Sequence, residues 1–253
     1  MLELVAQVLK NEQVSSSFFV LTLDAPELPK VNPGQFVQVR CRDASENAPF
    51  LRRPFSVMDQ RGSEIDLVYK VIGPGTTHMS RLRAGGEVSI LGPLGKGFSS
   101  QPSSDSKTLI VAGGTGLGGI YYLAKSLAAQ KQSVEILYGV RFRHEIATSL
   151  LDSLAVPYQV IVEDEHGYMT DKGLPERDLS QYARCCICGP TPMMRAVAEY
   201  VKTTVPIVEV SLEEMMGCGF GICYTCPVKR SDSDLFFGAC YDGPVFKYDS
   251  IAL

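Results

Sequence analysis

The chain has 253 residues, a length that fits two or three compact domains. Hydrophobic residues make up 45% and charged residues 21% of it, which excludes a disordered or collagen-like chain. The 24 Lys and Arg residues are outnumbered by 28 Asp and Glu residues, and the net charge of −4 leaves no basic excess for binding nucleic acid.

The N-terminal segment and the longest apolar run argue against export and membrane insertion. Residues 1–10 alternate apolar and polar side chains without a basic head and an apolar stretch, so we expect no secretory signal. Residues 109–124 are apolar, but five glycines interrupt them, and the run is too short to span a bilayer. We therefore expect a cytoplasmic protein whose eight cysteines bind metal or stay as thiols.

The first part of the chain predicts a small antiparallel β-barrel. Short stretches of alternating hydrophobicity are separated by turn clusters such as Asn32-Pro33-Gly34. We expect strands at residues 2–9, 18–24, 35–40, 54–59, 65–71 and 87–91. Strands of this length and spacing are typical of a closed barrel. The polar residues 99–106 then predict a linker.

The middle of the chain predicts alternating strands and helices. We expect strands at residues 108–112, 134–138, 158–162, 185–188 and 207–210, and helices at residues 116–130, 144–154 and 192–202. This alternation is typical of a parallel sheet with helices on both faces. The predicted architecture is multi-domain β plus α/β: a barrel domain at 1–100, an α/β domain at 101–210 and a small cysteine-containing domain at 211–253.

Four cysteines near the C-terminus form the most specific pattern in the chain. They are Cys218, Cys223, Cys226 and Cys240, and their C-x4-C-x2-C-x13-C spacing is that of plant-type [2Fe–2S] sites. Four thiolates supply two ligands to each of two irons, and glycines 217, 219 and 221 let the loop wrap closely around a cluster. Structural zinc is an alternative, although zinc sites usually pair two C-x2-4-C elements. Four buried free thiols are a further alternative.

The other four cysteines have no such spacing. Cys185, Cys186 and Cys188 lie in a predicted strand, where neighbouring side chains face opposite sides, and Cys41 stands alone in a loop. We expect these cysteines to pack as small hydrophobic side chains, with Cys188 a partial exception because of the residues that follow it.

Glycines after the strand at 108–112 predict a dinucleotide-binding loop. Gly114, Gly116 and Gly119 fit the G-x-G-x-x-G pattern between a strand and a helix. Without side chains there, a pyrophosphate can approach the backbone at the helix N-terminus. A helix packed tightly on a sheet would need the same glycines for steric reasons alone, so both interpretations stay open.

The end of a second predicted strand is also a candidate site for nucleotide binding. Cys188, Gly189 and Pro190 end one strand and precede a helix, at the sheet edge where α/β proteins bind ligands. A plain strand–helix corner is the alternative interpretation.

The choice between NAD and NADP stays open from the sequence. The acidic residue expected about 20 positions after the glycine loop is not evident, because Glu135 lies at the wrong end of its strand. Arg141 and Arg143, near the end of the same strand, would suit a 2′-phosphate.

The barrel segment contains candidate flavin-binding residues. Arg53 can clamp a phosphate, and Ser56 can form a hydrogen bond with a flavin edge. Thr76 can cap the short helical segment that ends near Leu82, and the N-terminus of that helix is another anion site. Each of these features is ordinary by itself.

In chain order, these features resemble the ferredoxin–NADP reductase superfamily. Arg53-Pro54-Phe55-Ser56 is similar to its R-x-Y/F-S/T flavin motif, residues 114–119 to its pyridine-nucleotide loop, and Cys188-Gly189-Pro190 to its C-G-P segment. With the added cysteine loop, residues 1 to about 248 most resemble the iron–sulfur electron-transfer subunits of class 1B dihydroorotate dehydrogenases.

The resemblance implies three cofactor sites. FAD would be held by Arg53, Pro54, Phe55, Ser56, Val68, Tyr69, Lys70, Gly75 and Thr76. NAD(H) would bind at Gly114, Gly116, Gly119, Cys188, Gly189 and Pro190. The [2Fe–2S] cluster would be held by Cys218, Cys223, Cys226 and Cys240.

The resemblance also implies an oxidoreductase subunit in a heterotetramer with two copies of an FMN-containing catalytic subunit. Dihydroorotate is oxidised in that partner for pyrimidine (UMP) biosynthesis, and electrons pass through [2Fe–2S] and FAD to NAD⁺. We expect no catalytic residue in this chain, since His78, His144 and His166 suit a solvated surface.

The alternative is another flavin and [2Fe–2S] NAD(P)H oxidoreductase, such as a sulfide dehydrogenase or a ferredoxin:NADP reductase. An oxygenase reductase is disfavoured, because the 43 residues after Val210 are too few for its separate ferredoxin domain.

Overall fold

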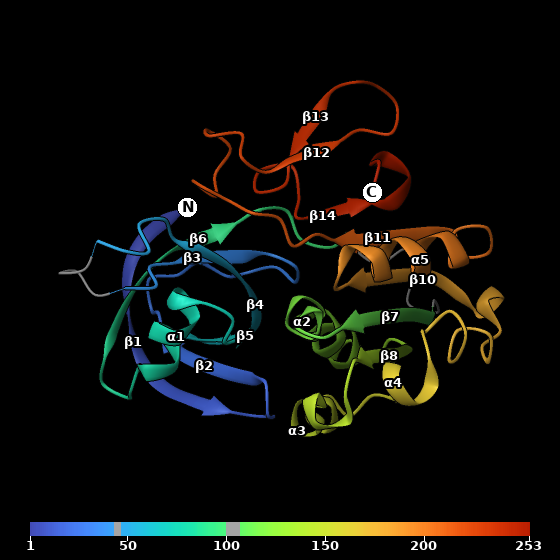
Figure 1. Cartoon of the computed structure of the whole chain (residues 1–253), viewed down its shortest axis with the longest axis horizontal. Helices are drawn as coiled ribbons and strands as arrows, with labels where there is room; N and C mark the ends of the chain where they lie inside the picture. The colour runs from blue at the N-terminus through green and yellow to red at the C-terminus, as the bar shows by residue number, and fades with distance from the viewer. Residues whose placement is uncertain (43–46, 100–106) are drawn as a thin grey trace.

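The computed structural model describes residues 1–42, 47–99 and 107–253 (Figure 1). Most of the predicted linker at 99–106, and with it the expected boundary between the first two domains, lies outside the described residues.

Six antiparallel strands close into a barrel, as predicted, and their order is β1-β2-β5-β4-β3-β6. The strands are β1 (Leu2–Gln13), β2 (Phe18–Asp24), β3 (Phe36–Val39), β4 (Arg53–Arg61), β5 (Glu64–Lys70) and β6 (Glu87–Leu94). Alternate side chains point inward, as in β6, where every second residue is buried. The short helix α1 (Pro74–Arg81) packs on the barrel through Met79, which is completely buried.

The second sheet has the order β14-β11-β10-β7-β8-β9, in which only β14 is antiparallel to its neighbour. Its strands are β7 (Lys107–Gly113), β8 (Val134–Val140), β9 (Tyr158–Val162), β10 (Tyr182–Cys188), β11 (Ile207–Ser211) and β14 (Val245–Lys247). The strand order reverses between β7 and β10. In open α/β sheets, ligands bind at the carboxyl ends of strands at such a switch point.

Helices cover both faces of this sheet. Leu109 and Val111 of β7 belong to the core cluster that includes α5 (Thr191–Val201). Ile110 and Ala112 of the same strand pack in the cluster that includes α2 (Gly116–Ala129). Alternate residues of β7 therefore pack into two different cores, one on each face of the sheet. This explains why the strand is a continuous apolar run.

The helix predicted over 144–154 is wrong as a single element. A 3-10 turn, η1 (Arg143–Glu145), is followed by a separate helix, α3 (Thr148–Ser153). The Glu145 carboxylate accepts the Phe142 N–H at 3.2 Å and contacts Lys70 Nζ of the barrel at 2.8 Å. These contacts stabilise a tight turn, and Ile146 leaves it in an extended conformation.

The other short elements are α4 (Glu163–His166), η2 (Leu179–Gln181) and η3 (Tyr248–Ser250). Two further strands, β12 (Pro227–Lys229) and β13 (Phe236–Gly238), form a hairpin. The sequence patterns did not predict β14, which pairs with β11 and covers its edge. Among the described residues, no helix is both long and apolar enough to cross a membrane.

Candidate cofactor and nucleotide sites

The four spaced cysteines are brought to one place by the β12–β13 hairpin. Cys226 comes directly before β12, and Cys240 follows soon after β13, so the hairpin returns the chain to its starting point. The Ala239 N–H donates to the Cys226 carbonyl oxygen at 2.9 Å, which ties the two cysteine segments together. The x13 interval in the sequence is therefore the length of one hairpin.

The loop before the hairpin points backbone N–H groups at sulfur. Cys218 Sγ accepts from the N–H groups of Phe220 and Ile222, each at 3.4 Å, and Cys223 Sγ accepts from the Cys218 N–H at 3.2 Å. Gly219 and Gly221 have φ values of +84° and +93°, which let the loop turn tightly. Such nests of N–H groups favour negative charge on sulfur.

The loop provides both exposed and buried thiols. Hydrogen bonds from the Thr225 hydroxyl and from backbone N–H groups lower the pKa of Cys223 to about 6. Burial and the neighbouring Cys226 thiol raise the pKa of Cys240 to about 12. Bound iron deprotonates such thiols outright.

The residues present fit a [2Fe–2S] cluster. Four soft thiolates with N–H donors on sulfur are the ligand set that such clusters use. Within the described parts of the chain, no group of three His, Cys, Asp or Glu side chains is placed to hold a single ion. A [2Fe–2S] cluster takes two thiolates on each iron and does not need such a group.

The candidate flavin residues begin at the exposed start of β4. The Arg53 guanidinium contacts only nearby backbone among the described residues, donating to the Leu51 carbonyl oxygen at 2.8 Å. The Phe55 ring meets the Tyr69 ring edge-on at 6.4 Å, and the Tyr69 hydroxyl donates to Asn11 Oδ1 at 2.9 Å. Tyr69 is therefore part of the barrel core, while Pro54 and Phe55 are half-buried.

Two candidate flavin residues touch the nucleotide-binding helix. A Cβ built on Gly118 of α2 would lie 2.0 Å from Val68 Cγ1, and one on Gly119 would lie 3.6 Å from Ser56 Oγ. The flavin strands and the glycine-rich helix are therefore in direct contact.

Gly75 and Thr76 shape the first turn of α1. Thr76 Oγ1 accepts from the N–H groups of Ile72 at 2.9 Å and Gly73 at 3.2 Å. Gly75 is buried, and an added Cβ would lie 3.0 Å from Cys41 Cβ. The turn is thus fixed by its own hydrogen bonds and by packing against Cys41.

A cleft of about 620 Å³ crosses the carboxyl ends of β9, β8, β7 and β10, with barrel residues along one side. It is lined by Phe18, Lys70, Gly113, Gly114, Thr115, Gly139, Val140, Arg141, Glu145, Ile161, Glu163, Gly167, Tyr168, Met169, Thr170, Pro190, Pro192, Met193, Ala196 and Val197. Because it spans the switch point of the sheet, this cleft suits a dinucleotide.

The glycines of the nucleotide loop fall into two groups. Gly114 lines the cleft, has a φ of +53°, and has open space where a Cβ would be. A Cβ on Gly116 would lie 2.2 Å from the Cys188 carbonyl oxygen, and one on Gly119 would lie 2.8 Å from Cys188 Sγ. Gly116 and Gly119 therefore allow close packing of α2, and Gly114 borders the candidate ligand.

The C-G-P segment lies at the same edge. Pro190 lines the cleft, whereas Cys188 is only 2% exposed, and burial raises its pKa well above the ordinary value. Gly189 has a φ of +152° and packs against Gly113. Cys185 and Cys186 are buried thiols in the same strand, in line with the packing role expected for them.

Lys70, a candidate flavin residue, lines the nucleotide cleft and is ion-paired with Glu145. This pair links the barrel to the α/β sheet. The sequence analysis missed Glu145, Glu163 and Tyr168, which also line the cleft. Glu163 directly follows β9. Because the predicted strand ended at residue 162, the next residue could have been predicted to lie at the ligand-binding edge of the sheet.

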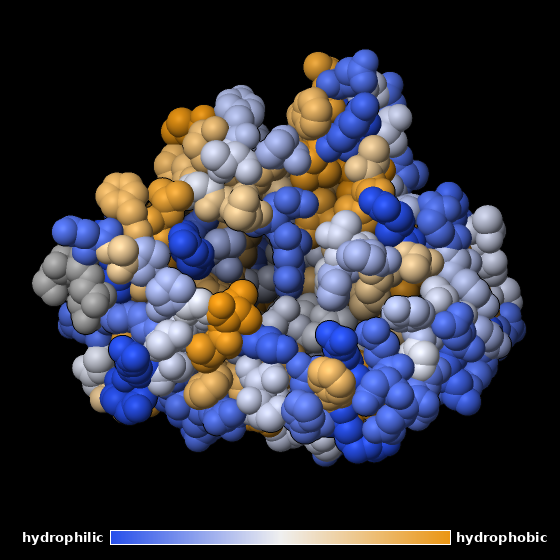
Figure 2. Space-filling model, in the orientation of Figure 1, coloured by the Kyte–Doolittle hydropathy of each residue, from blue (hydrophilic) through white to orange (hydrophobic). Residues whose placement is uncertain are grey.

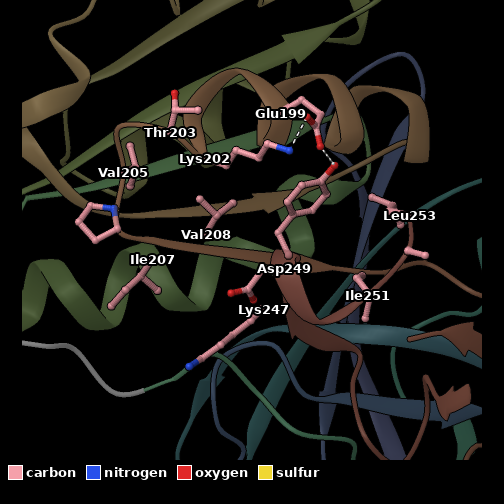
Figure 3. A pocket seen from close by; sticks show the side chains of 13 residues that line it. Glu199, Lys202, Thr203, Val205, Ile207, Val208, Lys247, Asp249, Ile251 and Leu253 are labelled. Atoms are coloured by element: carbon pink, nitrogen blue, oxygen red, sulfur yellow. Dashed lines mark hydrogen bonds and ion pairs between the residues drawn. The ribbon is translucent and has the colours of Figure 1, made fainter. Parts of the chain in front are cut away.

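A second cavity, of about 650 Å³, lies between α5 and the C-terminal turn (Figure 3). Glu199 accepts from the Tyr248 hydroxyl at 2.7 Å and pairs with Lys202 at 2.6 Å across one side of it. Ile207 and Val208 place this cavity at the amino end of β11. Since α/β sheets bind ligands at the opposite edge, the first cleft is the better candidate for a nucleotide site.

Comparisons with known proteins show which family the chain resembles. Residues 213–252 match the family model of the iron–sulfur cluster binding domain of dihydroorotate dehydrogenase B. The chain is 35% identical to the dihydroorotate dehydrogenase B (NAD⁺) electron transfer subunit of Desulforamulus reducens, over 95% of each chain. It is 34% identical to the subunit of the same name from Caldanaerobacter subterraneus, also over 95% of each.

Among solved structures, an NADH-dependent reduced ferredoxin–NADP oxidoreductase superposes with a TM-score of 0.83 at 25% identity, covering 98% of this chain and 89% of that one. The full-length identity to the curated subunits decides the family. The chain belongs to the family of dihydroorotate dehydrogenase B electron transfer subunits, flavin- and iron–sulfur-dependent oxidoreductase subunits that use FAD, a [2Fe–2S] cluster and NAD(H).

Proposed function

We propose that the chain carries electrons from the FMN of a dihydroorotate dehydrogenase catalytic subunit, through [2Fe–2S] and FAD, to NAD⁺ in pyrimidine (UMP) synthesis. The working complex would be a cytoplasmic heterotetramer with two copies of each subunit. Dihydroorotate loses two electrons and two protons in the partner, and NAD⁺ takes up two electrons and one proton here. Cysteines that form no disulfides, such as those of this chain, are typical of a reducing compartment.

One observation carries this proposal: the barrel touches both the cluster loop and the nucleotide-binding helix. Gln38 of β3 packs against Gly219 of the cluster loop, and Val68 of β5 packs against Gly118 of α2. FAD exchanges two electrons with a nicotinamide and single electrons with an iron–sulfur cluster. A flavin held by the barrel would therefore lie between its two redox partners.

We assign the residues accordingly. The cluster would be held by Cys218, Cys223, Cys226 and Cys240 of the unit at 211–253. FAD would be held in the unit at 1–100 by Arg53, Pro54, Phe55, Ser56, Val68, Tyr69, Lys70, Gly75 and Thr76. In the unit at 101–210, Gly114 and Pro190 would contact NAD(H), with Gly116, Gly119, Cys188 and Gly189 forming the floor behind them.

The role of the chain's own residues is to bind and orient the cofactors. Gly114 leaves the backbone open to a diphosphate beside the N-terminus of α2, whose N–H groups and dipole favour an anion. Met193 packs against Gly113 and Gly189, and Pro190 packs against Gly113, so the two side chains give the cleft an apolar wall.

Apolar side chains around the cluster loop support a protein partner there. Met215, Ile222, Tyr224 and Tyr241 are 87%, 73%, 81% and 65% exposed. Figure 2 shows hydrophobic residues gathered over this loop and over the neighbouring end of the barrel. Exposed apolar patches of this kind mark protein interaction sites.

The test is an anaerobic purification followed by iron and flavin assays, visible spectra and EPR, and then reconstitution with the catalytic subunit. We expect two irons and one FAD per chain and dihydroorotate-dependent NADH formation only in the complex. A colourless protein that contains zinc and no flavin would contradict the proposal.

A second candidate is a ferredoxin–NADP oxidoreductase, which the TM-score of 0.83 to such an enzyme favours. Reduced ferredoxin would then support NAD(P)H formation without the dihydroorotate dehydrogenase catalytic subunit. The same reconstitution, run with ferredoxin in place of that subunit, separates the two candidates.

A further inference from the structure

A buried glutamine lies between the flavin barrel and the cluster loop. Gln38 of β3 is 0% exposed, and within the described residues neither Nε2 nor Oε1 of its amide has a hydrogen-bond partner. Buried polar side chains in native proteins almost always have partners, so this amide has hydrogen-bonding capacity left for a group outside the protein chain, such as water or a cofactor.

The position of Gln38 in the barrel explains its direction. Its neighbours Val37 and Val39 are both completely buried in the barrel core. Because side chains alternate along a strand, Gln38 points out of the barrel. The surface it meets there is the cluster loop.

The contact is with the glycine that lies between Cys218 and Phe220. A Cβ built on Gly219 would lie 2.5 Å from Gln38 Nε2 and 2.6 Å from Gln38 Cγ. Gly219 follows Cys218, and the next residue, Phe220, donates its N–H to Cys218 Sγ at 3.4 Å. The amide is therefore held against the part of the loop whose donors already face sulfur.

We propose that Gln38 Nε2 donates a hydrogen bond to sulfur of the [2Fe–2S] cluster, either a ligating thiolate or a bridging sulfide. Gln38 is then a positioning residue that raises the reduction potential of the cluster and fixes its loop on the flavin barrel. The inference rests on the proposed function, because it requires the cluster. Hydrogen bonds to sulfur stabilise the more negative, reduced cluster and are one of the factors that set iron–sulfur potentials.

The test compares two glutamines of the barrel in the loaded protein. Gln38→Met keeps the volume and removes the amide. Gln60→Met is the matched control, because Gln60 Oε1 accepts from the Val31 N–H at 2.7 Å and its Nε2 donates to the Pro29 carbonyl oxygen at 3.4 Å. Redox titration monitored by EPR should show about a tenfold lower ratio of reduced to oxidised cluster in Gln38→Met at fixed ambient potential, which is about 59 mV. Gln60→Met should leave the potential unchanged.

A second measurement does not depend on a folded variant. In wild-type protein labelled with ¹⁵N in the glutamine amides, pulsed EPR of the reduced cluster should detect a coupled ¹⁵N nucleus. That coupling should be absent from Gln38→Met and present in Gln60→Met.

Three results would overturn the inference. They are a wild-type spectrum without ¹⁵N coupling, an unchanged cluster potential in Gln38→Met, and a shift confined to the flavin potential, which would assign the amide to FAD. A protein with no [2Fe–2S] EPR signal would contradict the proposed function as well, so the two failures can be told apart.

Discussion

The cluster loop and the nucleotide loop are both rich in glycine, but the glycines serve different purposes. Gly219 and Gly221 have φ values of +84° and +93°, so the cluster loop needs glycine for its backbone conformation. Gly116 lies in an ordinary helix, and glycine is needed there because a Cβ would lie 2.2 Å from the Cys188 carbonyl oxygen. A glycine-rich pattern therefore indicates either a turn around a ligand or close packing of two elements.

The largest expected effect is the loss of the iron–sulfur cluster when one cysteine of the cluster loop is replaced. Cys226→Ser should remove nearly all cluster iron and the associated EPR signal, because it replaces a buried cysteine that we propose as a cluster ligand. NADH oxidation with an artificial two-electron acceptor should continue, since FAD and the nucleotide cleft are untouched.

Cys185→Ala is the matched control for this variant. Cys185 is completely buried in β10, and burial raises the pKa of its thiol, so we expect it to contribute packing alone. Its variant should retain the cluster iron. Loss of iron from Cys185→Ala, or full retention in Cys226→Ser, would contradict the assignment of the ligands.

The next prediction compares the stability changes caused by substituting the two kinds of glycine in the nucleotide loop. Gly116→Ala should lower the free energy of unfolding by about 3 kcal/mol, because its Cβ meets backbone that cannot move aside. Gly114→Ala should lower it by only about 1 kcal/mol, the cost of a left-handed conformation in open space.

Urea unfolding measures both stability changes, and NADH binding should be weakened mainly in Gly114→Ala, whose side chain enters the cleft. If both substitutions lowered the free energy of unfolding equally, Gly114 and Gly116 would not have the different roles assigned to them.

The cluster-binding domain could be predicted from the sequence because four cysteines follow a fixed spacing. Cys218, Cys223 and Cys226 are local, and one hairpin returns Cys240 to them. The barrel and the parallel sheet were predictable for a similar reason, since alternation of side chains and of strands with helices is visible along the chain.

The nucleotide cleft was harder to predict because it is assembled from distant segments. Lys70 comes from the barrel, whereas Glu145 and Glu163 follow two different strands of the sheet. No periodicity connects these positions, and β14 likewise pairs with a strand, β11, that is distant from it in the sequence. Such contacts are tertiary, and local patterns do not encode them.

A smaller effect is expected for the acidic residue that would bind the adenosine ribose, which the sequence pattern did not reveal. Glu163 lines the cleft at the end of β9, two strands from the glycine loop, or about 10 Å at ordinary strand spacing. Of the two arginines that would suit a 2′-phosphate, Arg143 is ion-paired with Glu165, whereas Arg141 lines the cleft. We expect Glu163 to accept a hydrogen bond from the adenosine ribose and to disfavour NADPH.

Glu163→Ala should therefore reduce the preference for NADH over NADPH, measured as the ratio of kcat/KM values, by about tenfold. Asp164→Ala removes the same charge from the next residue, which does not line the cleft, and should leave the ratio nearly unchanged. Equal shifts in both variants would assign the preference to overall charge and not to a contact with Glu163.

The smallest effect tests the ion pair that joins the cleft to the barrel. Burial raises the pKa of Glu145, but the Lys70 ammonium and the Phe142 N–H outweigh it, so the pKa is lower than the ordinary value of 4.5. Because the folded pKa is depressed, the stabilising contribution is complete above pH 4.5 and is lost as the pH falls through the lower folded value.

Glu145→Gln should accordingly lower the free energy of unfolding by about 1 kcal/mol at pH 7, a modest value because the Lys70 side chain is 40% exposed. The difference from wild type, measured by urea unfolding, should shrink below pH 4.5. Glu12→Gln, which removes a carboxylate from the exposed pair with Lys10, should cause no measurable change at either pH. A difference that persists unchanged at low pH would mean that Glu145 stabilises this wall of the cleft through packing and not through its charge.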